Sequence, residues 1–126
     1  MSEYLIKKVA TGVKFDLLGS NGQVIATSEV YKTMAACRKG IESVRKNAPK
    51  AAVEDQTNSQ LAETNPKFEL YQDKTGMFRF RLRSRNGSII AVSESYSTRQ
   101  GCLQGIERVK NHANSEENPI FSGNKY

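Results

Sequence analysis

The chain has 126 residues, of which 37% are hydrophobic and 25% charged, and its formal net charge is +6. This composition is typical of a globular domain, and no stretch approaches the ~18–20 consecutive apolar residues of a membrane span. Two cysteines, one histidine and no tryptophan exclude a disulfide-built fold and the usual Cys/His type of zinc site.

The first half begins with a predicted meander of strands. Val13, Phe15 and Leu17 recur at every second position, which is typical of a half-buried strand. Asn21-Gly22 then predicts a tight hairpin, because both central residues of a type I′ turn need positive φ. The segment 25–28 supplies the returning strand.

A helix is predicted next, with Thr33 as its N-cap. Its apolar residues fall on one face; they are Cys37, Ile41, Val44 and Ala48. Arg38, Glu42 and Lys46 lie along the opposite, solvent-exposed side. Gly40 lies beside the apolar face, where a mid-helix glycine costs about 1 kcal/mol relative to alanine. We therefore expect a close approach between this helix and the sheet.

A polar segment, 47–66, follows the helix and contains one more short predicted strand at Ala51-Ala52-Val53. The corresponding strand near the C-terminus is predicted at Pro119-Ile120-Phe121. A loose tail, 122–126, would follow it.

The second half repeats the first. The string from Asn21 to Tyr31 returns as Asn86 to Tyr96, and the helix pattern returns from Thr98 to Ala113. About 16 of 36 aligned positions are identical at an offset of about 65 residues, which indicates an internal repeat. Upstream the register slips by one, so the second copy carries one extra residue near Met77.

Two copies explain how so short a unit can be stable. A unit of ~60 residues buries only about 60% of its unfolded surface and leaves a sheet edge open. We therefore predict a single α+β domain, 1–126, in which two β(3)-α-β repeats share one antiparallel sheet. Both helices would pack on one face, related by a pseudo-two-fold axis. The expected segments are repeat 1 (1–57), a linker (58–65), repeat 2 (66–121) and a flexible tail (122–126), and we expect a monomer.

The most distinctive polar feature is a row of arginines in the second half. Arg79, Arg81, Arg83 and Arg85 occupy every second position, so a single strand would present all four on one face. Guanidinium groups bind phosphate in a bidentate manner, and such a row suits a polyanion. The alternative is an ordinary solvated sheet face, on which Arg79 lies opposite Glu94 and Lys14 opposite Glu29.

No catalytic constellation is apparent. Ser28-Glu29 and Ser93-Glu94 place a hydroxyl beside a carboxylate in sequence, but adjacent strand residues point to opposite faces. Nucleophilic catalysis requires the two groups to touch, so we expect these serines to be structural. Cys37 and Cys102 occupy equivalent helix positions, where a free cysteine acts as a small hydrophobe.

The repeated motif set carries a family resemblance. Phe78-Arg79-Phe80-Arg81-Leu82, Asn86-Gly87, Ser93-Glu94-x-Tyr96 and Gly105-Ile106-x-x-Val109 resemble the YegP-like family of small bacterial proteins. The resemblance implies one or two copies of a β(3)-α-β unit, a shared sheet and exchanged C-terminal strands. It implies no assigned function and supplies no catalytic or ligand-binding residues.

These observations lead to one leading hypothesis and one alternative. We expect a non-enzymatic cytoplasmic module that binds a partner protein or a small ligand through a sheet face or the groove between the repeats. It would need no cofactor, metal or membrane. The alternative is nucleic-acid binding through Arg81, Arg83 and Arg85, with Arg79 as a fourth contact.

Overall fold

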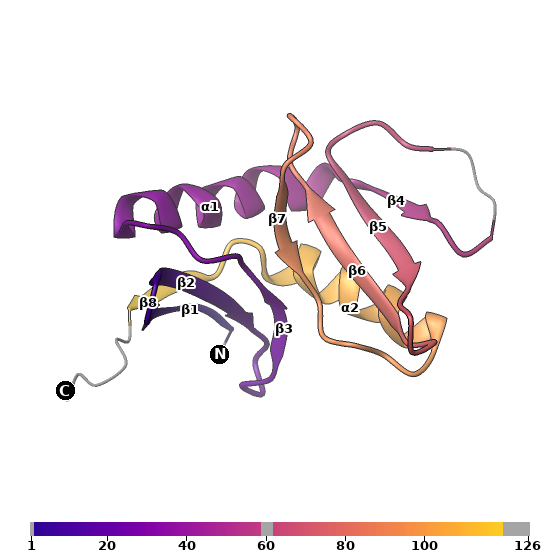
Figure 1. Ribbon diagram of the computed structural model, residues 1–126, viewed down its shortest axis with the longest axis horizontal. Coiled ribbons are helices and arrows are strands. Elements are labelled where there is room, and N and C mark those ends of the chain that lie inside the picture. Colours follow the sequence, from indigo (N-terminus) through magenta and orange to yellow (C-terminus); the bar gives the residue numbers. More distant parts are fainter. Residues whose placement is uncertain (1, 59–61, 120–126) are drawn as a thin grey trace.

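The computed structural model describes residues 2–58 and 62–119, which form eight strands and two α-helices (Figure 1). Repeat 1 comprises β1 (Glu3–Val9), β2 (Gly12–Leu18), β3 (Val24–Thr27), α1 (Met34–Asn47), the short 3-10 helix η1 (Ala48–Lys50) and β4 (Ala52–Asp55). Repeat 2 comprises β5 (Lys67–Gln72), β6 (Phe78–Arg83), β7 (Ile89–Val92), α2 (Arg99–His112) and β8 (Glu116–Pro119). The predicted β(3)-α-β order of each repeat is confirmed.

All eight strands belong to one sheet, in the order β4-β5-β6-β7-β3-β2-β1-β8. The six central strands are antiparallel, whereas β4 runs parallel to β5 and β8 parallel to β1. The prediction of a wholly antiparallel sheet is therefore wrong at both edges. The reason is that each edge strand follows a helix that crosses to the other repeat, where it is added beside a strand that runs in the same direction. The exchange of C-terminal strands that the family resemblance implied is confirmed.

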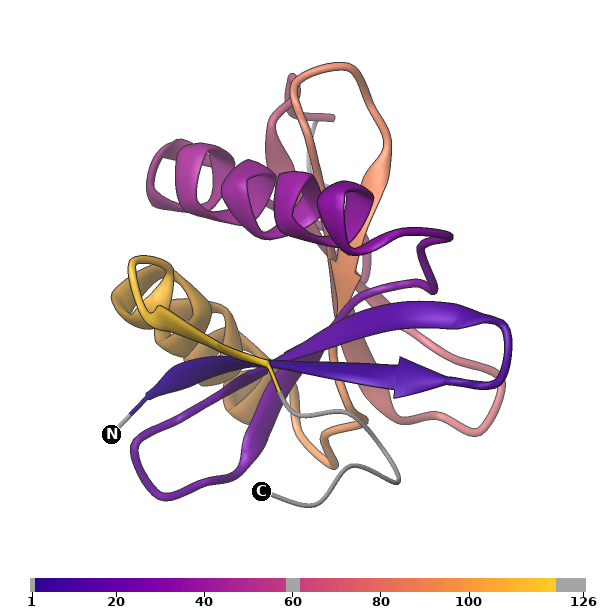
Figure 2. The same cartoon turned by 90° about the vertical axis from the view of Figure 1, so that its left-hand side faces the viewer.

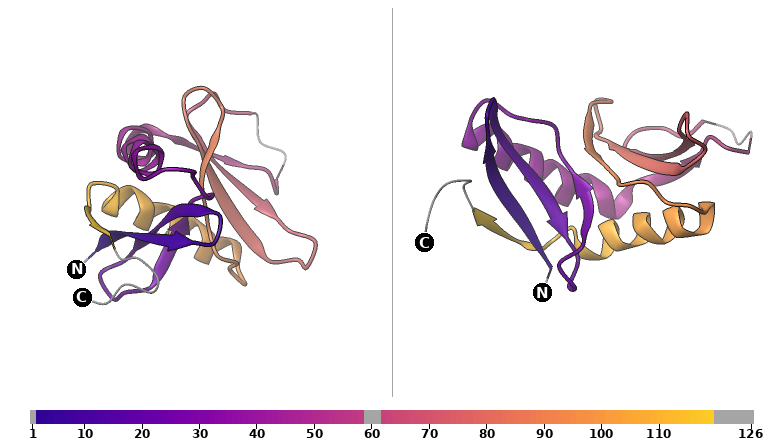
Figure 3. Two further views of the ribbon diagram at one scale, coloured as in Figure 1. Left: turned by 60° about the vertical axis from the view of Figure 1, so that its left-hand side comes forward. Right: turned by 60° about the horizontal axis from the view of Figure 1, so that its bottom comes forward.

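The pseudo-two-fold axis passes through the centre of the sheet. There Thr27 of β3 pairs with Val92 of β7, and these two residues occupy equivalent positions of the two repeats, 65 residues apart. Figures 2 and 3 show both helices on the same side of the strongly twisted sheet. The α+β architecture with two helices on one face is thus as the sequence predicts.

The two helices begin and pack as their sequence patterns indicate. Thr33 accepts a hydrogen bond from the Ala36 N–H at 3.0 Å, and Thr98 accepts one from Gly101 at 2.9 Å. The predicted apolar face of α1 is buried. Gly40, however, makes room for a side chain rather than for the sheet: a Cβ there would collide with the Tyr31 phenol.

The same tyrosine contact recurs in repeat 2, where a Cβ at Gly105 would collide with the phenol of Tyr96. Tyr96 also stacks on Phe80, with ring centroids 6.3 Å apart, just as Tyr31 stacks on Phe15 at 6.4 Å. Each tyrosine therefore lies between a phenylalanine of the sheet and a glycine of the helix, both from its own repeat.

The hairpin turns differ from the predicted two-residue Asn-Gly type. The Gly87 N–H donates to the Ser84 carbonyl at 2.9 Å, so Arg85 and Asn86 are the central residues of the turn. Gly87 follows with φ of +91°, and the β6–β7 register shifts between Leu82 and Arg83. The Asn86 side chain accepts from the backbone N–H of Ser88 at 3.2 Å, which stabilises this wider turn.

The C-terminal strand lies earlier than predicted. β8 is formed by Glu116–Pro119 and pairs with β1 from Glu3 to Ile6. Of the strand predicted at Pro119-Ile120-Phe121, the last two residues lie outside the described residues, as does the predicted tail, 122–126. The prediction relied on the apolar residues Ile120 and Phe121. β8 instead has a largely polar sequence and is stabilised by its backbone pairing with β1.

Candidate functional site

The arginine row begins as predicted but does not continue to its fourth member. Arg79, Arg81 and Arg83 are half-buried and alternate along β6 with the residues that face the core. Arg85 lies beyond the strand, in the turn, where it is exposed and faces the end of α1. The expectation that all four guanidinium groups share one sheet face is therefore wrong for Arg85.

The two middle arginines bind one buried carboxylate. Glu69 Oε1 accepts hydrogen bonds from Arg81 Nε at 2.6 Å and from Arg83 Nε at 2.8 Å. Lys67 Nζ lies 3.3 Å from the other oxygen of Glu69. Burial raises the pKa of Glu69, but these three cations outweigh it and hold the pKa below its usual value. Glu69 thus compensates part of the positive charge of Arg81 and Arg83 within the sheet.

Arg79 also has an acidic partner, although not the predicted one. Its Nε donates to Asp73 Oδ2 at 2.8 Å. Hydrogen bonds from Thr75 and Arg79 hold the pKa of the Asp73 carboxyl well below its usual range. The predicted ion pair between Arg79 and Glu94 is wrong, because Asp73 binds the Arg79 Nε; the hydrogen bond to Asp73 raises the pKa of Arg79 most, and the charge of the exposed Glu94 adds a smaller effect.

Repeat 1 carries a corresponding carboxylate at a different position. Asp16 on β2 is 4% exposed and lies 2.8 Å from Lys7 Nζ and 3.6 Å from Lys14 Nζ. Burial raises the pKa of Asp16, yet the bonds from Lys7 and Thr27 hold it below the usual value. Lys14 therefore faces Asp16, and the predicted pair of Lys14 with Glu29 is wrong.

The serines of the two Ser-Glu motifs bind the backbone. Ser28 Oγ accepts from the Phe15 N–H at 2.9 Å and donates to the Glu29 carbonyl at 2.7 Å. Ser93 repeats this arrangement with Phe80 and Glu94 at the same two distances. Each hydroxyl therefore completes the hydrogen bonding where its strand leaves the sheet, in line with the structural role expected of it.

The two cysteines are free and buried in the core. Burial raises the pKa of the Cys37 thiol to about 11 and that of Cys102 to about 12. Both are therefore protonated at neutral pH, and a protonated thiol is a poor nucleophile.

Two features are absent from the part of the chain that the structure describes: a cluster of metal-binding side chains and a helix that could span a membrane. Within 2–58 and 62–119, no three His, Cys, Asp or Glu side chains are grouped so that they could hold a metal ion. In the same residues, no helix has the length and apolar character needed to cross a membrane.

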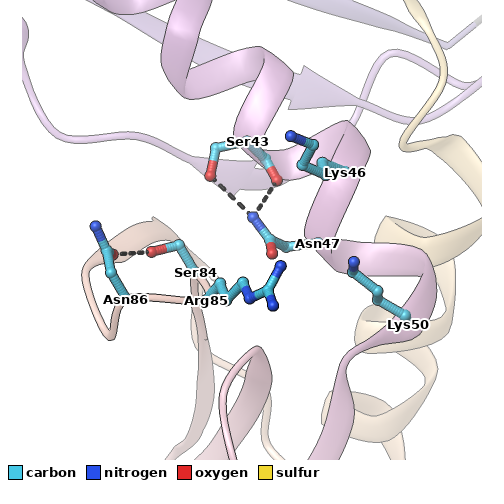
Figure 4. Close-up of a pocket in the computed structure, with 7 residues that line it drawn as sticks. All are labelled: Ser43, Lys46, Asn47, Lys50, Ser84, Arg85 and Asn86. Atoms are coloured by element: carbon cyan, nitrogen blue, oxygen red, sulfur yellow. Dashed lines mark hydrogen bonds between the residues drawn. The ribbon is translucent and has the colours of Figure 1, made fainter.

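A cavity of about 410 Å³ lies where the end of α1 meets the β6–β7 turn (Figure 4). We call it the inter-repeat pocket, because one wall belongs to repeat 1 and the other to repeat 2. The residues that line it are Ser43, Lys46, Asn47, Lys50, Ser84, Arg85 and Asn86. Every lining side chain is polar or cationic.

Hydrogen bonds fix the neutral residues of the inter-repeat pocket. Asn47 is 4% exposed, and its Nδ2 donates to the Ser43 carbonyl at 2.8 Å and to Ser43 Oγ at 3.0 Å. On the other wall, Ser84 Oγ donates to Asn86 Oδ1 at 2.5 Å. Hydrogen bonds therefore connect neutral side chains within each wall of the pocket.

Three cations surround this polar floor. Lys46 and Lys50 extend from the end of α1 and from η1, and Arg85 extends from the opposite wall toward Asn47 and Lys50 (Figure 4). Among the described residues, no carboxylate lies within 4.0 Å of any of the three. They thus differ from Arg79, Arg81 and Arg83, which all have acidic partners.

The pseudo-two-fold axis does not reproduce these cations. At an offset of 65 residues, Lys46, Lys50 and Arg85 correspond to Asn111, Ser115 and Ser20. At the same offset, the positions equivalent to Ser43 and Asn47 are occupied by Arg108 and His112. Burial raises the pKa of Tyr96 and the charge of Arg108 lowers it, so Arg108 lies close to the Tyr96 phenol, although the buried Nε of Arg108 has no hydrogen-bond partner among the described residues.

The sequence indicated the groove between the repeats as one possible place for a ligand, but not the residues of the inter-repeat pocket. It assigned Lys46 to the exposed side of a helix and Arg85 to a strand, and it gave no role to Ser43, Asn47 or Lys50. One signal was available: the three cations are absent from the equivalent positions of the other repeat. A comparison of the two repeats in sequence could have indicated these three residues, but not that they line the same cavity.

Comparison with known proteins agrees with the repeat and the fold. A family model described as "Domain of unknown function (DUF1508)" matches twice, at residues 10–55 and 73–118. A UPF0339 protein of Photorhabdus laumondii is 41% identical over 101 residues, covering 80% of this chain and 76% of that protein. The UPF0339 protein YegP of Escherichia coli O157:H7 is 35% identical over 115 residues, covering 89% of each.

Relatives with a single copy also exist. A UPF0339 protein of Methanosarcina acetivorans is 57% identical over 47 residues, which is 37% of this chain but 81% of the relative. Among solved structures, the solution structure of YegP from E. coli, titled a protein of unknown function, superposes with a TM-score of 0.80 at 28% identity. That match covers 98% of this chain and 96% of YegP.

Proposed function

This chain belongs to the DUF1508 family of proteins of unknown function, and on that premise we propose that it is a non-catalytic module that binds a small anionic ligand in the inter-repeat pocket. The observation that carries the proposal is that Lys46, Lys50 and Arg85 all line one cavity of about 410 Å³. That volume falls within the range of small-molecule sites.

The electrostatics of the chain support this site over the rest of the surface. Glu69 and Asp16 are buried beneath the cations that contact them, so these cations of the sheet already have carboxylate partners. In contrast, three cations without a carboxylate partner attract an anion and raise its local concentration. The inter-repeat pocket is thus the better place for an anion.

A binding role also suits the chemistry of the titratable groups. A catalytic site needs titratable side chains whose shifted pKa values converge on a cavity. Here the lowered carboxyl pKa values belong to ion pairs of the sheet, and the raised thiol pKa values belong to the core. The pocket residues supply charge and hydrogen bonds, which are the means of binding.

Nucleic-acid binding through the arginine row is the alternative. The common face of Arg79, Arg81 and Arg83 on β6 favours it, whereas their bonds to Asp73 and Glu69 count against it. A polyanion would have to compete with those carboxylates for the charge of each guanidinium. The cytoplasmic location expected from the sequence is compatible with either ligand.

An NMR titration distinguishes the two. Inorganic phosphate added to ¹⁵N-labelled protein at low ionic strength should shift the amides of residues 43–50 and 84–87, with millimolar affinity. A single-stranded oligonucleotide should leave the amides of 79–83 unchanged. Phosphate that shifts no pocket amide would overturn the proposal. Oligonucleotide shifts along 79–83, with affinity that falls steeply with salt, would favour the alternative.

A further inference from the structure

We infer that the ligand of the inter-repeat pocket is a phosphate monoester carried on a hydroxyl-rich body, such as a sugar phosphate, and that one molecule binds per chain. The inference rests on the proposed function and adds the chemical class and the stoichiometry. Three observations lead to it: the number of unpaired cations, the chemistry of the lining and the asymmetry of the two repeats.

The charge of the pocket selects the anionic group. Lys46, Lys50 and Arg85 together carry three positive charges with no carboxylate within 4.0 Å in the described residues. A phosphate monoester carries about −1.5 to −2 at neutral pH and presents three oxygens, whereas a carboxylate or a phosphodiester carries about −1. The monoester therefore compensates the pocket most nearly, and its oxygens match the fork of Arg85.

The neutral lining selects the rest of the ligand. Ser43, Asn47, Ser84 and Asn86 offer hydroxyl and amide groups to a ligand. In the described residues Asn47 forms hydrogen bonds through its amide nitrogen, so its oxygen is left to accept from a ligand hydroxyl. The lining consists of Ser, Asn, Lys and Arg, which gives a nucleobase no aromatic ring for stacking. A polyol fits this surface better than a base does.

The asymmetry of the repeats sets the stoichiometry. The positions equivalent to Lys46, Lys50 and Arg85 hold uncharged residues in the other corner of the molecule. The anion must also be contacted from both sides, by α1 and η1 of repeat 1 and by the β6–β7 turn of repeat 2. One complete site therefore exists per chain, and it requires both repeats.

Calorimetry with defined probes tests this inference. Glucose 6-phosphate should bind 1:1, and about tenfold more tightly than gluconate, which has a similar polyol but a single carboxylate, or than inorganic phosphate. Arg85→Gln and Lys46→Gln should each weaken glucose 6-phosphate binding about tenfold, equivalent to about 1.4 kcal/mol. Lys74→Gln is the matched control: this exposed lysine lies in the β5–β6 turn, and its loss should change affinity less than twofold.

The outcomes separate this inference from the proposed function. If gluconate or inorganic phosphate binds as tightly as glucose 6-phosphate, and Arg85→Gln still weakens binding, the sugar-phosphate class is wrong and the anion site stands. If none of the three probes binds, both proposals fail. Two molecules bound per chain would contradict the asymmetry argument. Thermal unfolding of each variant checks that the fold is intact, since all three substituted side chains are exposed.

Discussion

Glu54 shows how one carboxylate can connect distant segments of the chain. It is 7% exposed and binds Lys67 Nζ at 2.7 Å, the Gln56 side chain at 2.6 Å and the backbone N–H of Glu63 at 2.8 Å. Because these bonds favour the ionised form, they lower the pKa of Glu54 to about 2. Glu54 therefore joins β4, β5 and the segment that precedes β5.

This shift gives a pH-dependent contribution to stability. The folded pKa lies below the unfolded one, so the stabilisation is complete above pH of about 4.5 and is lost as the pH falls toward about 2. Glu54→Gln should lower the free energy of unfolding at neutral pH. The difference in unfolding free energy between this variant and the native chain should then narrow by about 2 kcal/mol as the pH falls from about 5 to about 3. Urea unfolding at several pH values measures both.

The control for this prediction is Glu94→Gln, because Glu94 is exposed. The unfolding free energy of Glu94→Gln should stay within about 0.5 kcal/mol of the native value at every pH. A Glu54→Gln variant whose deficit does not change with pH would show that the Glu54 carboxylate is not held in its ionised form by the fold.

At this scale the sequence predicts the position of a residue better than its partner. The alternation along β6 places Arg79, Arg81 and Arg83 on one face correctly. Their partners are Glu69 on β5 and Asp73 in the turn that follows β5. The register between β5 and β6 decides which carboxylate lies beside which arginine. Cross-strand pairs depend on register, which a bulge shifts by one residue.

The packing of each helix depends on the absence of a side chain at Gly40 or Gly105. An isolated helix would gain about 1 kcal/mol from alanine at either position. In this fold the new Cβ would collide with the hydroxyl end of Tyr31 or Tyr96. Each of these tyrosines stacks on a phenylalanine of the core. The packing cost of overfilling a core is about 1–3 kcal/mol, so the packing term should exceed the gain in helix propensity.

We therefore expect Gly40→Ala to lower the free energy of unfolding by about 1 kcal/mol. Tyr31→Phe removes the hydroxyl that collides with the new methyl, so the double variant should be more stable than the two single changes predict. Chemical denaturation of the three variants gives this coupling energy. Additive effects, or a stabilised Gly40→Ala, would mean that the tyrosine does not limit the space at this helix.

Element prediction succeeds where local patterns decide the structure. The strand alternation, the threonine caps and the helix face all follow from short-range periodicity, and each is found where expected. β8 is the exception, because Glu116–Pro119 has little strand-forming character and is defined by its parallel partner β1. The inter-repeat pocket is a second exception, since its two walls meet only after the repeats assemble.

The edge strands of the sheet join the two repeats into one body. β4 belongs to repeat 1 but pairs with β5 of repeat 2, and β8 belongs to repeat 2 but pairs with β1 of repeat 1. The central junction between β3 and β7, in comparison, contains one residue pair, Thr27 with Val92. Separation of the repeats would expose two sheet edges along with the helix-covered core.

Cleavage of the chain within 58–65 should therefore leave the two fragments associated. We expect the nicked protein to co-elute in gel filtration near 14.0 kDa and to unfold in one transition whose midpoint rises with protein concentration. Intact protein, which we expect to be monomeric, should show no such concentration dependence. Fragments that separate and melt independently would contradict the single-domain prediction.

The parallel pairing at both sheet edges also bears on chain connectivity. In the present order, eleven residues lead from the end of β4 at Asp55 to the start of β5 at Lys67. By the pseudo-two-fold relation, the end of β8 at Pro119 and the start of β1 at Glu3 stand in the same geometry, and residues 120–126 with 1–2 supply nine residues to join them. A circular permutant that starts at β5 would thus reverse the order of the repeats while every strand kept its neighbours.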